Sequence, residues 1–324
     1  MRQSPRWALA VALLAMPALA PASASPPLPD FAVADRLLPV DPMPERQTQW
    51  SNRAVTLTDV VYATIPFFRP LHLDLYRQAG ATALRPLVVF VHGGGWAHAN
   101  PRAGGSFVDF PAVLANLAER GYVVASIEYR FSGEAPFPAQ LEDLQAAIRF
   151  LRGNAERFGI DGARVGLWGM SAGAQLAALN AVNCAAGTCV QGFVGWFGAY
   201  DMASYLRDSQ DDTYISSLFR CGTGACATEV LERASPIHFA DRTDPPVLLI
   251  HGLDDTNSRS SQSERFAQQL RAAGSSAELL LFPGAKHGLI GANEAATKKS
   301  VRAALTATFD FFDRVLQDPP AAAR

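Results

Sequence analysis

From residue 55 onward, short apolar runs rich in β-branched residues alternate with amphipathic runs of period 3.6. Short apolar runs are typical of buried strands, and the 3.6 period is that of a helix with one buried face. The pattern predicts eight strands, at residues 55–62, 71–76, 87–92, 122–127, 164–168, 193–197, 247–251 and 278–282. One predicted helical face is marked by Leu141, Leu144, Ile148 and Leu151, and the last by Leu305, Phe309, Phe312 and Leu316.

Strands that alternate with helices predict βαβ units and therefore an α/β fold, with a mostly parallel central sheet of about eight strands and helices on both faces. No helix separates the first two strands, so we expect them to pair antiparallel at one edge. A single domain over residues 55–316 accounts for the whole pattern. Residues 199–236 make a long connection between two core strands and predict a rim or cap over a site.

The two ends of the chain differ from this domain. Arg2 and Arg6 precede an apolar run and an Ala-Ser-Ala site, which predicts a signal peptide over residues 1–24 and export to the periplasm or beyond the cell. The run has 14 residues, whereas a membrane anchor needs about 20. Residues 25–54 hold six prolines and predict an extended arm, and residues 317–324 predict a frayed tail.

Composition narrows the classes of partner. Hydrophobic residues make up 49% of the 324 residues and charged residues 18%, which excludes a disordered chain. The formal net charge is −2, and the sequence has no cluster of Lys and Arg. Because binding to nucleic-acid phosphates needs such clusters, we expect no nucleic-acid partner. The sequence leaves the oligomeric state open.

Because the protein is predicted to be exported, its four cysteines are candidates for disulfide bonds. They form two C-x4-C pairs, Cys184 with Cys189 and Cys221 with Cys226. Four cysteines allow three pairings, of which two local disulfides are the simplest in an oxidising compartment. Zinc is the alternative, but no histidine lies within ten residues of either pair, so we expect no metal there.

Residues 169–173 match the pattern G-x-S-x-G, with Ser171 at its centre. A predicted strand precedes the motif and an Ala- and Leu-rich helix follows it. A sharp strand-to-helix turn needs small residues around the serine and leaves its hydroxyl exposed at a helix N-terminus. The alternative is a glycine-rich helix start in which Ser171 is only an N-cap. The context favours a nucleophile.

A second motif, His-Gly-Gly-Gly-Trp at residues 92–96, ends an earlier strand. Three glycines leave backbone N–H groups unobstructed, which suits them to bind an oxyanion. A flexible turn is the alternative, and a phosphate loop is excluded because no Lys follows at the required spacing.

Taken together, these motifs resemble those of the α/β-hydrolase superfamily, in particular its hormone-sensitive-lipase-like and carboxylesterase members. Within that group the chain is similar to the secreted branch of acetyl- and feruloyl-ester hydrolases. The resemblance covers residues 55–316 and implies that Gly94 and Gly95, with Ala172 after the serine, supply an oxyanion hole. The sequence departs from the family pattern at one place, where Ala174 and Gln175 stand instead of the Gly-His that often follows Ser-Ala-Gly. The resemblance therefore does not define the details of the acyl pocket.

The other two catalytic positions lie later in the chain. His287 is the only histidine after the last predicted strand, and neighbouring glycines allow its loop to reach the strand ends. Three carboxylates can complete a triad: Asp201, Asp254 and Asp255. The resemblance places the acid four residues after the His of a His-Gly pair, which selects Asp255.

The sequence therefore predicts a secreted serine carboxylic-ester hydrolase with Ser171, His287 and Asp255 as its triad, acting on small or aromatic acyl esters without a metal or cofactor. Its partner is a small-molecule ester, and no stable membrane anchor is expected. An amide-cleaving enzyme of the same fold, such as a formamidase, is one alternative. A catalytically silent binding protein on the same fold is the other.

Overall fold

The computed structural model describes residues 46–208, 213–222 and 226–317. The predicted signal peptide, residues 25–45 of the predicted arm and residues 318–324 of the predicted tail lie outside these ranges. No helix within them combines the length and apolarity that a bilayer crossing requires.

The described residues form one nine-stranded sheet with the spatial order β1-β2-β3-β5-β4-β6-β7-β8-β9. The strands are β1 (Arg46–Gln49), β2 (Ala54–Ala63), β3 (Leu71–Gln78), β4 (Arg85–Val91), β5 (Val123–Ile127), β6 (Ile160–Met170), β7 (Gly192–Trp196), β8 (Val247–Gly252) and β9 (Ala277–Phe282). The pairs β1–β2, β2–β3 and β3–β5 are antiparallel, and all remaining pairs are parallel. The predicted antiparallel pairing of the first two predicted strands, β2 and β3, is confirmed, but β1 lies outside them at the edge of the sheet.

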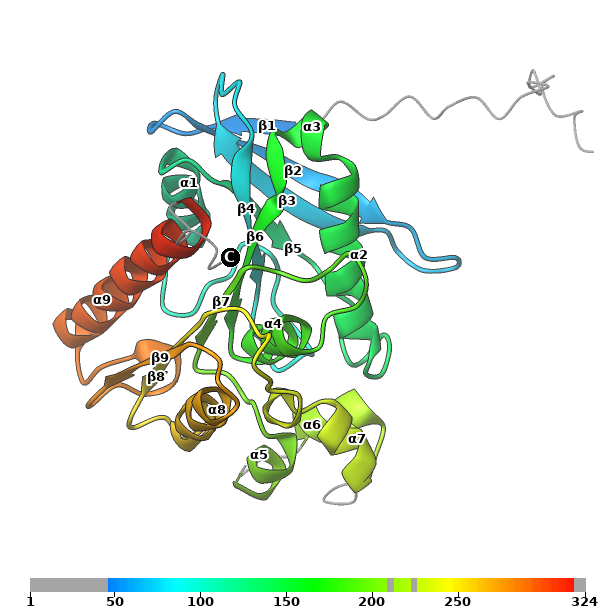
Figure 1. Cartoon of the computed structure of the whole chain (residues 1–324), viewed down its shortest axis with the longest axis vertical. Helices are drawn as coiled ribbons and strands as arrows, with labels where there is room; N and C mark the ends of the chain where they lie inside the picture. The colour runs from blue at the N-terminus through cyan, green and yellow to red at the C-terminus, as the bar shows by residue number, and fades with distance from the viewer. Residues whose placement is uncertain (1–45, 209–212, 223–225, 318–324) are drawn as a thin grey trace, which may run out of the picture. The chain divides into compact units, whose positions relative to one another are not determined.

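Helices cover both faces of the sheet (Figure 1). They are α1 (Phe110–Glu119), α2 (Ala139–Gly153), α3 (Ala155–Phe158), α4 (Ala172–Val182), α5 (Met202–Asp208), α6 (Thr213–Phe219), α7 (Thr228–Arg233), α8 (Ser261–Ala272) and α9 (Glu294–Phe312). Short helical turns are η1 (Pro236–His238), η2 (His287–Leu289) and η3 (Asp313–Gln317). In Figure 1, α1 and α9 lie on one side of the sheet and α2 and α4 on the other.

Two apolar layers result from the period-two alternation of the central strands. In β4, Leu87, Val89 and Val91 belong to the layer that contains α2, α4 and α8. Val88 and Phe90 belong to the layer that contains α1 and α9. A strand buried on both faces reads as a continuous apolar run, which is why β4 was predictable from sequence.

The prediction of eight strands missed the first one. The four residues of β1 are all exposed and polar, so they carry no apolar alternation. Backbone pairing with β2, in the register of Arg46 opposite Thr58, makes this segment a strand. The sheet therefore begins before the predicted boundary at residue 55, inside the predicted arm.

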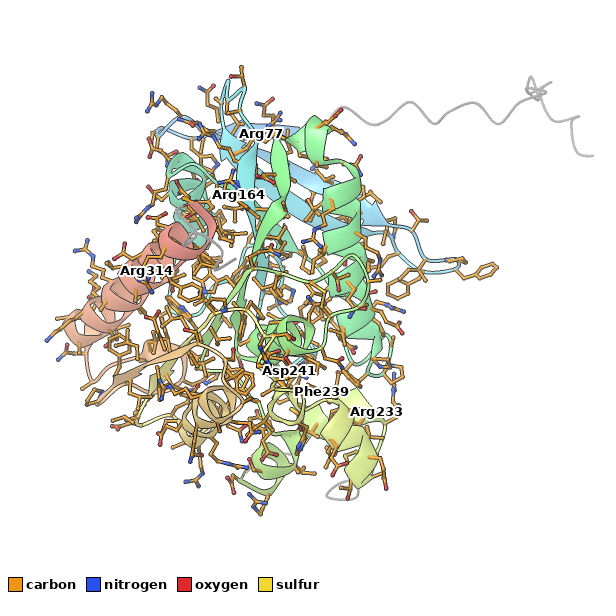
Figure 2. The ribbon with its side chains drawn as sticks, in the orientation of Figure 1. Arg77, Arg164, Arg233, Phe239, Asp241 and Arg314 are labelled. Carbon is orange, nitrogen blue, oxygen red and sulfur yellow. A yellow bond between two sulfur atoms is a disulfide. The ribbon has the colours of Figure 1, made fainter. Side chains whose placement is uncertain are left out.

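The insertion over residues 199–236 carries α5, α6 and α7. Figure 2 shows Arg233 of α7 far from Arg77 of β3, which lies at the end of the sheet where β4 and β6 begin. The insertion thus lies toward the opposite end, where the parallel strands finish. Disulfides join Cys184 to Cys189 and, within the insertion, Cys221 to Cys226.

Candidate active site

Ser171 lies in the tight turn between β6 and α4, with a left-handed backbone (φ 52°, ψ −121°). A Cβ on Gly169 would lie 2.4 Å from the Gly173 carbonyl oxygen, and a Cβ on Gly173 would lie 2.1 Å from that of Val91. Both glycines of the motif are therefore sterically required. The strained conformation lifts the Ser171 side chain above the carboxyl end of β6.

The structure brings the three predicted catalytic side chains into one hydrogen-bonded chain. His287 Nε2 lies 3.1 Å from Ser171 Oγ, and His287 Nδ1 lies 2.7 Å from Asp255 Oδ2. Phe197 packs against the imidazole with its ring centroid 4.9 Å away, which restricts the rotation of His287. This arrangement lets the imidazole accept a proton from the hydroxyl while a carboxylate orients its other nitrogen.

Asp255 is held rigidly and remains ionised. Its Oδ1 accepts the backbone N–H groups of Asn257 and Ser258, and its Oδ2 faces the rings of His287 and His251. Burial by itself would raise the pKa of Asp255, but the hydrogen bonds from the two histidines, the charge of His287 and the Ser258 N–H together hold that pKa well below its usual range.

The other two candidate acids lie elsewhere. Asp254 is exposed. Asp201 accepts the backbone N–H of Ser204 at the start of α5, and it pairs with Arg265. Asp201 therefore caps a helix, a role that its position before Met202 suggests.

Three backbone N–H groups, in the serine turn and in the glycine loop that shares a cavity with Ser171, have no acceptor among the described residues. They belong to Gly94, Gly95 and Ala172. Gly94 and Gly95 have positive φ angles of 107° and 58°. Free N–H groups beside a serine hydroxyl can hold an oxyanion.

A cavity of about 420 Å³ opens beside Ser171, Gly94 and Gly95. Its apolar wall comes from Met170, Phe197, Tyr205, Tyr214 and Ile290. The two tyrosines belong to the insertion, and no sequence motif marks them. Ala174 and Gln175, the two positions that depart from the family pattern, do not line this cavity, and both are buried in α4.

The loop that carries His287 is joined to the segment after residues 92–96, the predicted oxyanion loop. Ser106 Oγ donates a hydrogen bond to the Gly288 carbonyl oxygen at 2.6 Å, and Ser106 itself lines the cavity. Sequence reasoning missed this serine, because residues 97–109 carry no motif.

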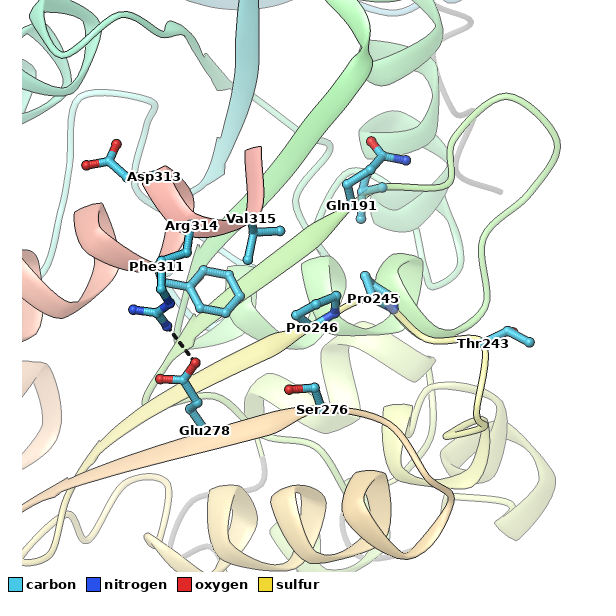
Figure 3. A pocket seen from close by; sticks show the side chains of 11 residues that line it. Gln191, Thr243, Pro245, Pro246, Ser276, Glu278, Phe311, Asp313, Arg314 and Val315 are labelled. Atoms are coloured by element: carbon cyan, nitrogen blue, oxygen red, sulfur yellow. Dashed lines mark hydrogen bonds and ion pairs between the residues drawn. The ribbon is translucent and has the colours of Figure 1, made fainter. Parts of the chain in front are cut away.

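A larger cavity, of about 780 Å³, lies where β8 and β9 begin (Figure 3). Pro245, Pro246 and Phe311 line it beside the ion pair of Arg314 with Glu278 at 2.6 Å. None of the predicted catalytic residues lines this cavity, since they follow the opposite ends of the strands. Size therefore does not identify the site.

The buried ring of His92 contacts the backbone of the predicted oxyanion loop. It stacks on Tyr129 with centroids 4.4 Å apart, and it lies 2.7 Å from the Gly93 carbonyl oxygen through Nδ1. Burial lowers the pKa of His92 to about 4, although the hydrogen bond to Gly93 opposes the shift.

This shift predicts a pH dependence of stability. Between pH 6.5 and about 4 the unfolded chain binds a proton at His92 that the folded protein does not, so the free energy of unfolding falls as pH falls. The loss reaches about 3 kcal/mol at pH 4. Urea unfolding across this range measures it. His92→Asn should make the free energy of unfolding depend less on pH, whereas His98→Asn, at an exposed ring, should leave the dependence unchanged. Equal slopes in the wild type and both variants would show that His92 is not its source.

The chain is similar to one family model and to several known esterases. The family model BD-FAE matches residues 73–270. Esterase LipC of Mycobacterium tuberculosis is 32% identical over 231 residues, which cover 67% of this chain and 56% of that protein. Isoprenylcysteine alpha-carbonyl methylesterase ICME of Arabidopsis thaliana is 29% identical over 247 residues, covering 70% and 55%. The chain thus spans just over half the length of these relatives.

Among solved structures, a truncated carbohydrate esterase from gut microbiota superposes with a TM-score of 0.69 at 27% identity. The match covers 82% of this chain and 97% of that one. The predicted α/β-hydrolase fold is confirmed.

Proposed function

This chain belongs to the BD-FAE family, and we propose that it is a secreted serine carboxylic-ester hydrolase acting through an acyl-enzyme. The observation that carries the proposal is the hydrogen-bonded chain from Ser171 through His287 to Asp255, beside three free backbone N–H groups. The esterase names of its relatives support the same reaction class.

In the first half-reaction, Ser171 Oγ attacks the ester carbonyl carbon while His287 Nε2 takes the hydroxyl proton. The negative charge that develops on the carbonyl oxygen is held by the N–H groups of Gly94, Gly95 and Ala172. Asp255 stabilises the imidazolium through Nδ1–H. The tetrahedral intermediate collapses when His287 returns the proton to the leaving alcohol, and the acyl group remains on Ser171.

In the second half-reaction, water takes the place of the alcohol. His287 removes its proton, and the hydroxide attacks the acyl carbon at the same oxyanion site. The acid leaves and Ser171 regains its proton, so the enzyme is unchanged.

The cavity supports small or aromatic acyl esters as substrates. Its volume of about 420 Å³ is near the lower end for small-molecule sites. Rings of Phe197, Tyr205 and Tyr214 give flat apolar surfaces for a short chain or a ring. A Cβ on Gly95 would lie 2.7 Å from the Tyr214 ring, so Tyr214 covers the oxyanion loop directly and limits the space above it.

A panel of chromogenic esters with increasing acyl length tests the proposal. We expect acetyl and other short esters to give the highest kcat/KM, and formyl-amide substrates to be poor. Tyr214→Ala should raise kcat/KM for longer acyl chains about tenfold relative to acetyl, because it removes one wall of the cavity. Phe67→Ala, at a fully exposed ring outside the cavity, is the control. Faster turnover of formyl amides than of acetyl esters would favour a formamidase instead.

Export is part of the proposal. It is supported by the signal-like sequence of residues 1–24 and by the two disulfides, since such bonds persist in oxidising compartments.

A further inference from the structure

A buried amide connects the oxyanion loop with the insertion. Gln175 lies one turn into α4, four residues after Ser171, and its side chain is fully buried. Its Oε1 accepts the indole N–H of Trp96 at 3.0 Å, and its Nε2 donates to the Ala234 carbonyl oxygen at 2.7 Å. The indole can only donate and the carbonyl can only accept, so the two neighbours determine the orientation of the amide.

Trp96 is the residue through which this amide reaches the oxyanion loop. It directly follows Gly95, is 2% exposed, and has a φ of 57°. A non-glycine residue in the left-handed region is strained and persists only where its surroundings hold it. Its carbonyl accepts the N–H of Ser132 at 2.7 Å, and its indole N–H has Gln175 as acceptor.

The other end of the amide reaches the insertion. Ala234 precedes Ser235, whose hydroxyl accepts the N–H of Met202 at the start of α5. The Trp96 ring also meets Tyr205 of α5 edge-on, with centroids 6.3 Å apart. The oxyanion loop and the wall of the cavity therefore share one buried polar connection.

We propose that Gln175 is a positioning residue: through Trp96 it holds the N–H groups of Gly94 and Gly95 at the place where the oxyanion forms. This inference rests on the proposed function. Oxyanion donors act mainly in the transition state, so a small displacement of the loop lowers kcat more than it changes KM.

Gln175→Met tests the inference, because methionine keeps the length of the side chain and removes both hydrogen bonds. Complete loss of one oxyanion donor typically costs 10²–10³ in rate, so we expect a displaced pair to lower kcat by about 10- to 100-fold with KM within about threefold. The rate constant of labelling by a fluorophosphonate should fall in parallel with kcat.

Asn180→Leu is the matched control. Asn180 is also buried on α4, and its amide also donates to a backbone carbonyl, that of Thr188 at 2.9 Å, but it does not contact the oxyanion loop. We expect it to lower the thermal midpoint while kcat stays within about twofold. If Gln175→Met and Asn180→Leu lower kcat equally, Gln175 is only structural and the inference is wrong.

Trp96→Phe removes the indole N–H, which is the donor of the same hydrogen bond. If Gln175→Met does not fold, Trp96→Phe takes its place in the test. If the bond acts as proposed, each single variant and the double variant lower kcat by similar factors, because the second change removes nothing further. Multiplicative losses would overturn the inference. A wild-type protein that hydrolyses no ester and takes no label would instead refute the proposed function, before any variant is compared.

Discussion

Ser171→Ala should abolish ester hydrolysis and fluorophosphonate labelling while the protein keeps its fold. Ser171 Oγ is the atom that would form the acyl bond, and no other hydroxyl lies within hydrogen-bond reach of His287 among the described residues. Loss of a serine nucleophile typically costs about a million-fold in kcat. The backbone of the turn, with its φ of 52°, tolerates alanine as it tolerates serine, since both carry a Cβ.

Activity on an activated acetyl ester and mass spectrometry of the labelled peptide measure this loss. Ser300→Ala removes a hydroxyl that only bonds the Ala296 carbonyl within α9, so this control should keep full activity. Wild-type turnover by Ser171→Ala would show that another residue is the nucleophile.

Asp255→Asn should lower kcat by about 10⁴. The ionised carboxylate accepts the Nδ1–H of His287 and stabilises the imidazolium, whereas an amide is neutral and can present its NH2 group to the ring. The remaining activity comes from the oxyanion site and substrate binding.

Two other aspartates serve as controls for the acid. Asp254→Asn changes an exposed side chain, and Asp201→Asn changes a helix cap that pairs with Arg265. We expect both to keep kcat within roughly tenfold, with some loss of stability in Asp201→Asn. If Asp201→Asn loses its activity while Asp255→Asn stays active, the acid of the triad is Asp201, in the loop after β7.

Local features of the chain were predictable because neighbouring residues determine them. The apolar run of β4 is buried on both faces, so its sequence alone indicates a central strand. The small residues around Ser171 indicate the strand-to-helix turn, because larger side chains would clash there. The position of His287 after the last predicted strand depends only on the order of elements along the chain.

The choice between adjacent candidate residues and the first strand of the sheet could not be predicted from local sequence patterns. Asp254 and Asp255 are adjacent, and only the resemblance to a family favoured Asp255 before the structure placed its carboxylate 2.7 Å from His287. The polar strand β1 has no pattern of its own and exists because β2 offers a free edge.

The sequence by itself determined the α/β class, the serine turn and the candidate histidine, which follow from local patterns and from the order of elements along the chain. Tertiary structure alone decided the walls of the cavity and the connection through Gln175. Trp96 is 79 residues from Gln175 in sequence, and Ala234 is 59 residues from it. A glutamine in a buried helix carries no local signal for its partners, because hydrogen bonds over such separations exist only once the sheet has brought the loops together.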